Sequence, residues 1–171
     1  GGAIVEELQR ALTGKVDLRR EFVLIFHGLC EKLEDHRYRF FAPYYGEGSS
    51  NQSRGLCHAA DCEQMDTRLI TDRKTPFSYV EHTGEFNRTL GGFNCLYIGG
   101  VAHELGHGLG LPHNREQPGE KRMLGTALMG SGNYTYRHER WGQKGSFLTF
   151  ASATRLASHP LFTGSDRGRW D

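Results

Sequence analysis

Apolar residues in the first dozen positions follow the period of an amphipathic helix, and polar residues fill the opposite side. The pattern predicts a helix over residues 3–12, with Gly14 just beyond its end. One side of this helix should therefore be buried. Its apolar face would be formed by Ile4, Val5, Leu8, Ala11 and Leu12.

Two short runs of aliphatic and aromatic residues come next. FVLIFHGL, from Phe22, and YRFFAPYY, from Tyr38, predict strands of a sheet that packs on the first helix. Residues 46–66 are rich in Gly, Ser, Asn and charge, which predicts a long surface loop. Weaker patterns predict two more short strands, near 68–71 and at 77–82.

The clearest periodic segment, 90–109, predicts a second helix with its histidines off the core side. Beyond Asn114 the sequence favours irregular structure up to Gly145. SFLTFASATRLAS then predicts a C-terminal helix that ends before His159. The core side of the second helix would carry Phe93, Leu96, Tyr97, Val101, Leu105 and Leu109.

Length and charge narrow the function. A chain of 171 residues with net charge +1 and scattered basic residues suits one globular, monomeric unit, not a nucleic-acid binder. No apolar run is long enough to span a membrane. Four cysteines predict two disulfides in an exported protein, with Cys57 and Cys62 close enough to close a small loop. Three connectivities are open, and four reduced thiols are the alternative.

The stretch VAHELGHGLGLPHN, residues 101–114, concentrates metal-binding chemistry. His103 and His107 are four residues apart, so both imidazoles can reach one ion from one helix face. Gly110 can adopt a left-handed turn that returns the chain toward that ion. His113 would then complete a three-histidine site for one catalytic zinc, with a fourth position open for water. Glu104 points off the ligand face and is placed to act as general base on that water.

At these residues the sequence resembles the metzincin zinc metallopeptidases, because HExxHxxGxxH is matched in full from His103 to His113. The resemblance implies three histidine ligands, Glu104 as catalytic base and a methionine turn below the zinc. Met129, in GTALMGSG, is the candidate for that turn, and an ordinary core methionine is the alternative.

The expected fold is α+β and metzincin-like: a mixed twisted sheet, a zinc-binding active-site helix and a mostly irregular C-terminal subdomain ending in a helix. Residues 1–163 would form the catalytic domain, divided near residue 110, and 164–171 a tail or linker. Asn114 matches none of the subfamily-specific residues that follow the third histidine in the better-known metzincin groups, so the subfamily is unassigned.

Two tyrosines after the methionine are further candidates. Tyr134 and Tyr136 could polarise the substrate oxyanion, although lining the pocket or packing in the core are more ordinary roles. The remaining histidines are scattered and are interpreted as surface or hydrogen-bonded residues: His27, His36, His58, His82, His138 and His159.

The sequence thus predicts a secreted zinc endopeptidase that acts on peptide or protein substrates. An inhibitory prosegment is a further partner that the resemblance allows. Two alternatives stay open: a catalytically silent zinc-bound binding module, which the intact Glu104 disfavours, and a hydrolase of a non-peptide amide.

Overall fold

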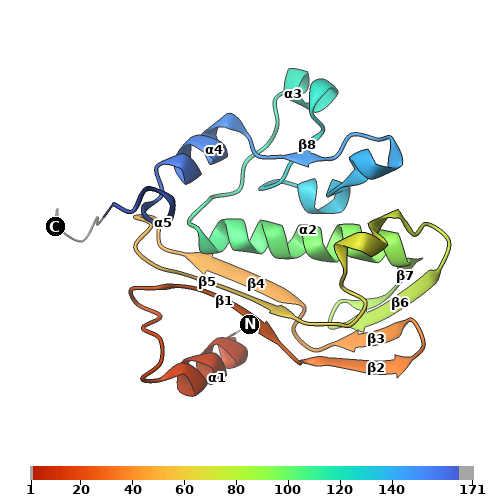
Figure 1. The fold of residues 1–171 in the computed structure, drawn as a ribbon, viewed down its shortest axis with the longest axis horizontal. Coiled ribbons are helices and arrows are strands. Elements are labelled where there is room, and N and C mark those ends of the chain that lie inside the picture. The colour runs from red at the N-terminus through yellow and green to blue at the C-terminus, as the bar shows by residue number, and fades with distance from the viewer. Residues whose placement is uncertain (1, 166–171) are drawn as a thin grey trace.

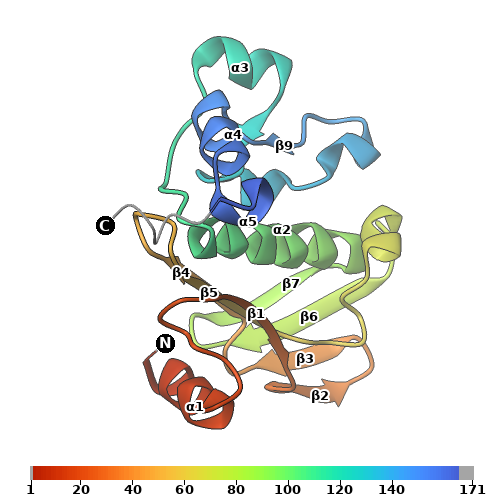
Figure 2. The ribbon, with the colours of Figure 1, turned by 60° about the vertical axis from the view of Figure 1, so that its left-hand side comes forward.

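A long helix crosses the middle of the molecule and separates two parts of different character. The computed structural model describes residues 2–165. Helix α2 (Leu90–Gly108) lies with the strands on one side and the C-terminal part on the other (Figures 1 and 2). Thr89 caps its start, because the Thr89 hydroxyl accepts a hydrogen bond from Gly92 N–H at 3.1 Å. The predicted helix over 90–109 is confirmed.

A three-stranded sheet carries the site-bearing end of α2. Its strand order is β1 (Phe22–His27), β5 (Gly55–Ala60), β4 (Tyr44–Gly48), so β1 and β4 are its edges. β5 is parallel to β1 and antiparallel to β4. The sheet is therefore mixed, as expected for the α+β class.

A four-stranded sheet completes the strand layer. Its order is β2 (Cys30–Glu34), β3 (Arg37–Phe40), β6 (Pro76–Glu81), β7 (Gly84–Thr89), and only the β3–β6 pair is parallel. The predicted strand at 77–82 is confirmed as β6. YRFFAPYY, interpreted as one strand, is divided at Pro43 between β3 and β4.

Helix α1 (Gly2–Leu12) lies on the face of the three-stranded sheet opposite α2 (Figure 2). It confirms the predicted opening helix, and Gly14 just beyond it has φ +77°. The prediction of a strand near residues 68–71 is wrong. It forms a 3-10 helix, η1 (Thr67–Thr71), because the Asp66 carboxylate caps Arg68 N–H at 2.7 Å.

The C-terminal part is built from short elements rather than being mostly irregular. The predicted C-terminal helix is confirmed, but it begins only at Phe150, because Ser146–Phe147 forms a short strand, and a second, shorter helix begins at Pro160. From residue 166 on, the predicted tail lies outside the described residues. The elements are α3 (Pro118–Met123), β8 (Thr126–Ala127), η2 (Gly132–Thr135), η3 (His138–Trp141), β9 (Ser146–Phe147), α4 (Phe150–Ala157) and α5 (Pro160–Thr163).

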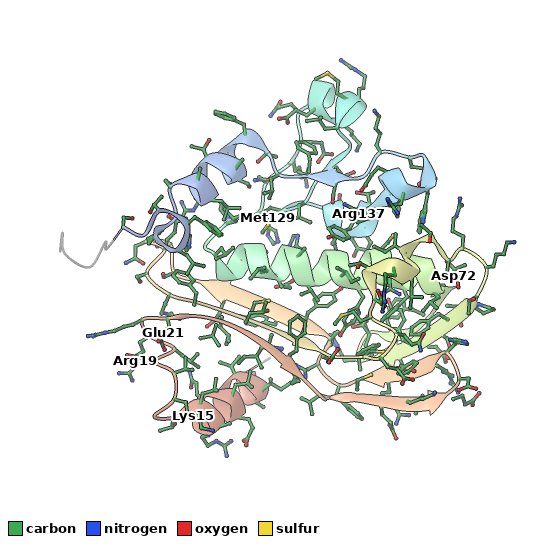
Figure 3. The ribbon with its side chains drawn as sticks, viewed as in Figure 1. Lys15, Arg19, Glu21, Asp72, Met129 and Arg137 are labelled. Atoms are coloured by element: carbon green, nitrogen blue, oxygen red, sulfur yellow. The ribbon has the colours of Figure 1, made fainter. Side chains whose placement is uncertain are left out.

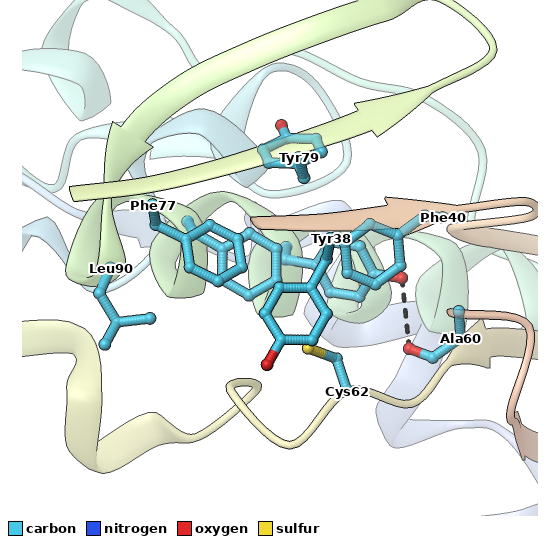
Figure 4. Packing of buried hydrophobic residues seen from close by; sticks show 9 residues of the cluster. Tyr38, Phe40, Ala60, Cys62, Phe77, Tyr79 and Leu90 are labelled. Carbon is cyan, nitrogen blue, oxygen red and sulfur yellow. Dashed lines mark hydrogen bonds between the residues drawn. The ribbon is translucent and has the colours of Figure 1, made fainter. Parts of the chain in front are cut away.

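Aromatic rings form the core between α2 and the four-stranded sheet (Figure 4). Phe93 on α2 stacks on Phe77 with ring centroids 4.2 Å apart, and Tyr97 lies 4.8 Å from Phe40. The Tyr97 hydroxyl donates to the Pro43 carbonyl at 2.7 Å, so the buried polar group is satisfied. This core holds the first half of α2 in place, and the second half contains His103, Glu104 and His107.

The prediction of a surface loop over 46–66 is wrong. All six residues of β5 are buried, and this strand lies at the centre of its sheet. The strand begins with a glycine because α2 passes directly over it: a Cβ on Gly55 would overlap the Gly108 carbonyl. The same crowding buries α2 nearly all round, including His103, instead of only along one stripe.

The predicted disulfides are also not found, since Cys30, Cys57, Cys62 and Cys95 are all free thiols. Cys57 packs below Gly108 of α2, whereas Cys62 belongs to the aromatic core beyond the end of β5. The rigid strand between them therefore prevents the small loop that their spacing suggested.

Two of the scattered histidines form a hydrogen-bonded pair in the three-stranded sheet. His27 Nε2 and His58 Nδ1 are 3.1 Å apart, and His58 is only 2% exposed. Burial, and then the neighbouring His27, lower the pKa of His58 to about 4. The folded protein therefore favours the neutral imidazole. The contribution of neutral His58 to the free energy of unfolding is therefore complete above pH 6.5 and is lost as the pH falls toward 4.

We expect acidification from pH 7 to pH 5 to cost the metal-free protein about 2 kcal/mol of unfolding free energy through His58. Urea unfolding of the wild type and a His58→Gln variant across this range would measure it. The variant should lose less stability, whereas His82→Gln, at an exposed histidine, should behave as the wild type. If the unfolding free energies of the wild type and His58→Gln depended on pH in the same way, His58 would not be the group that causes the loss.

Candidate metal centre

Three histidines converge at the end of α2. His103 and His107 stand one helical turn apart, with their Nε2 atoms 3.1 Å from each other. His113, from the following loop, places its Nε2 atom 3.2 Å from His103 and 3.0 Å from His107. The predicted cluster is therefore confirmed, and it is the one group of three or more candidate ligands within residues 2–165.

The donor set fits a zinc ion. A tetrahedral zinc with bonds of about 2.0–2.1 Å needs ligand nitrogens about 3.3 Å apart, close to the observed spacings. The rings are oriented from behind, since His103 Nδ1 lies 2.6 Å from the Leu128 carbonyl and His107 Nδ1 2.9 Å from the Leu111 carbonyl. Each Nδ1 then carries the proton and leaves Nε2 free as a ligand. Burial lowers the pKa of His103, which also favours the neutral, metal-binding form.

Gly110 makes the turn that returns the chain to the cluster. Its φ is +76°, the left-handed conformation expected from the sequence. Its N–H donates to the His107 carbonyl at 2.8 Å, and Leu111 N–H donates to the Gly106 carbonyl at 2.9 Å. These bonds end α2 and direct His113 toward the other two histidines.

Glu104 is held by the edge of the three-stranded sheet. Its Oε2 atom accepts a hydrogen bond from Gly46 N–H of β4 at 2.8 Å. A Cβ on Gly46 would overlap the Glu104 carbonyl oxygen, so the strand and the helix approach as closely as only glycine permits. No sequence pattern pointed to Gly46, because its role depends on a contact 58 residues away.

Met129 lies against the same helix, between α2 and the C-terminal part (Figure 3). It is 1% exposed, and a Cβ on Gly106, between the first two histidines, would overlap its sulfur. The neighbouring Leu128 carbonyl meets His103, and the Met129 carbonyl accepts a bond from Asn114 N–H at 3.1 Å. Residues 128–130, here called the methionine segment, thus contact the chain next to each of the three histidines.

The two candidate tyrosines point to different surroundings. Tyr134, in the last half of η2, is 59% exposed. Tyr136 packs against Gly99, one turn of α2 before His103, and lines a separate cavity with Thr67 and Ile70. No hydrogen bond within the described residues links either phenol to the histidine cluster, and their roles stay predictions.

A cavity of about 580 Å³ opens beside the cluster. It begins at His113 and continues between the loop that follows and the methionine segment. A salt bridge of 3.4 Å between Lys121 and Glu116 forms part of its wall. Most of the lining side chains are polar, and the lining residues are His113, Asn114, Arg115, Glu116, Lys121, Gly130 and Ser131.

Comparison with known proteins gives structural neighbours only. No protein-family model and no curated protein matches the chain. Solved structures of OgpA from Akkermansia muciniphila match at 26–27% identity. The wild type in two crystal forms gives TM-scores of 0.53 and 0.56. The catalytically inactive form, in complex with an O-glycopeptide substrate (glycodrosocin), gives 0.58. These matches cover 92–94% of this chain but only 37–38% of OgpA. The likeness supports a shared mixed α+β fold.

Proposed function

We propose that the protein is a zinc-dependent endopeptidase of the metzincin type. The observation that carries the proposal is the convergence of three Nε2 atoms at 3.0–3.2 Å, with a carboxylate on the next residue of the same helix. The OgpA neighbours, one of them bound to a peptide-based substrate, support peptide-bond chemistry. We assign His103, His107 and His113 as ligands and Met129 as the supporting methionine.

The residues divide the reaction between them. Zinc, when bound, supplies Lewis-acid polarisation of a carbonyl and lowers the pKa of water from about 15.7 to about 7. Glu104 accepts the proton of the attacking water and returns it to the leaving amine. Gly46 N–H occupies one carboxylate oxygen, which orients the other toward the substrate. Tyr134 and Tyr136 stay candidates for contacts with the substrate oxygen or pocket.

O-Glycopeptides are the substrate class that the neighbours favour, since inactive OgpA was solved with one. The cavity beside His113 is lined by groups that can bond sugar hydroxyls, among them Arg115, Glu116 and Lys121. Matched peptides with and without an O-linked sugar on one Ser or Thr would test this preference. Equal cleavage of the two peptides would contradict a preference for O-glycopeptides and would indicate an endopeptidase that does not recognise the sugar.

The setting of the protein also belongs to the proposal. We propose an extracytoplasmic, monomeric enzyme in which residues 1–163 act as one catalytic domain, with an inhibitory prosegment as a further partner. Within residues 2–165 no helix has the length and apolarity to cross a membrane. The chain spans less than two-fifths of the OgpA chains, so any activity of the whole OgpA protein is carried over only as this proposal.

The test is metal content combined with peptide cleavage. After dialysis against zinc and then metal-free buffer, we expect one zinc per chain. Cleavage of a diverse peptide library should stop with a chelator and return on adding zinc. At free zinc 100-fold above the dissociation constant, the unfolding free energy should rise by about 2.7 kcal/mol. Zinc binding without cleavage of peptides would favour the silent binding module or the non-peptide amide hydrolase, and no zinc binding would contradict the proposal.

A further inference from the structure

Helix α4 contacts the chain on both sides of His113. Arg155 Nε donates to the Gly110 carbonyl at 2.8 Å, three residues before the ligand. Asn114, the next residue after it, donates through Nδ2 to Thr149 Oγ1 at 3.0 Å and Ser152 Oγ at 2.6 Å. His113 itself is exposed and lies outside α2. Its position therefore depends on these loop contacts and not on helix geometry.

The same arginine reaches the hairpin between β4 and β5. Its second nitrogen, Nη2, donates to the Ser50 carbonyl at 2.5 Å. Gln52, 2% exposed and with φ +57°, donates back to the Arg155 carbonyl at 3.2 Å. This hairpin continues strand β4, whose Gly46 holds Glu104. One planar guanidinium thus joins the loop of the third histidine to the strand that orients the carboxylate.

We propose that Arg155 is a positioning residue, which sets the place of His113 relative to His103, His107 and Glu104. The inference rests on the proposed zinc site. A guanidinium presents its N–H groups in a fixed plane, so two carbonyls bound to it are held at a fixed separation. Loss of this bridge frees the Gly110 turn from the hairpin, and the third ligand then samples positions that do not complete the tripod.

The experiment compares Arg155→Met and Arg155→Lys with Arg10→Met, a matched change at an exposed arginine of α1, which lies across the three-stranded sheet from α2. Zinc affinity is measured by competition with a chelating dye, and coordination geometry by the visible spectrum of the cobalt(II)-substituted protein. We expect Arg155→Met to weaken zinc binding by about 10- to 100-fold, the usual range for groups that orient ligands, and to alter the cobalt spectrum. Arg155→Lys should lie between, since one ammonium lacks the planar fork.

All measurements are made where circular dichroism shows the metal-free variants folded. A lower melting temperature with wild-type zinc affinity and cobalt spectrum would overturn the proposal and leave Arg155 a stabilising residue. If Arg155→Met does not fold, Arg155→Lys decides: wild-type zinc affinity and spectrum again overturn it. A wild type that binds no zinc would contradict the proposed function itself, which is a different result.

Discussion

Replacement of Glu104 by Gln should lower kcat/KM for peptide cleavage by about 10²- to 10⁴-fold while zinc content stays at the wild-type level. Gln keeps the shape of the side chain and an oxygen that can still accept the Gly46 N–H bond. It cannot take a proton from water. Because Glu104 is not one of the three convergent ligands, the metal should remain. Steady-state kinetics and metal analysis on the same samples measure both effects.

The matched control is Glu6→Gln, an exposed carboxylate on α1 far from the cluster. It should leave both kcat/KM and zinc content unchanged. Full activity in Glu104→Gln would show that another group takes the proton. Loss of zinc along with activity would instead place Glu104 among the groups that hold the ion.

The site was more predictable than the fold around it, and local geometry explains the difference. His103, His107 and Gly110 act within two turns of helix and one turn of loop, so their spacing alone fixes where they point. The left-handed Gly110 and the convergence of His113 were predicted for this reason, and both were confirmed. The identity of the bound ion stays part of the proposal.

The central strand β5 was not predicted because its residue types are determined by packing against α2, which is distant in the sequence. β5 reads GLCHAA, and small residues preceded by a polar stretch are typical of a loop. They are small because α2 lies against them, with Gly55 under Gly108. The hydrophobic periodicity of one segment cannot reveal a contact with another segment, and here the two contacting positions are more than 50 residues apart.

The same reason explains the residues of the site that escaped prediction. Arg155 and Gln52 meet Gly110 only because three separate segments come together in the fold. The disulfide prediction failed similarly. Cys57 and Cys62 are near in sequence, but the extended strand separates them: Cys57 lies against Gly108 of α2, and Cys62 lies beyond the end of β5 in the aromatic core.

Gly46→Ala tests whether the approach of β4 to α2 matters for chemistry as well as stability. The added Cβ would overlap the Glu104 backbone oxygen, and no flexible side chain can move aside to relieve it. We expect a loss of about 1–3 kcal/mol in unfolding free energy, measured by denaturant titration. Because the strand must retreat, the 2.8 Å bond to the Glu104 carboxylate should break and kcat/KM should fall too. Gly28→Ala is the control, since a Cβ there meets no atom within 4 Å.

A double-mutant cycle separates the two effects of this glycine. If Gly46 influences catalysis by orienting the Glu104 carboxylate, adding Gly46→Ala to Glu104→Gln should lower kcat/KM much less than Gly46→Ala does alone. Fully additive losses would mean that the strand acts on another part of the reaction, for instance by holding substrate. Unchanged stability and activity in Gly46→Ala would mean that β4 does not approach α2 this closely in solution. The cycle thus tests the geometry of the carboxylate independently of the identity of the metal.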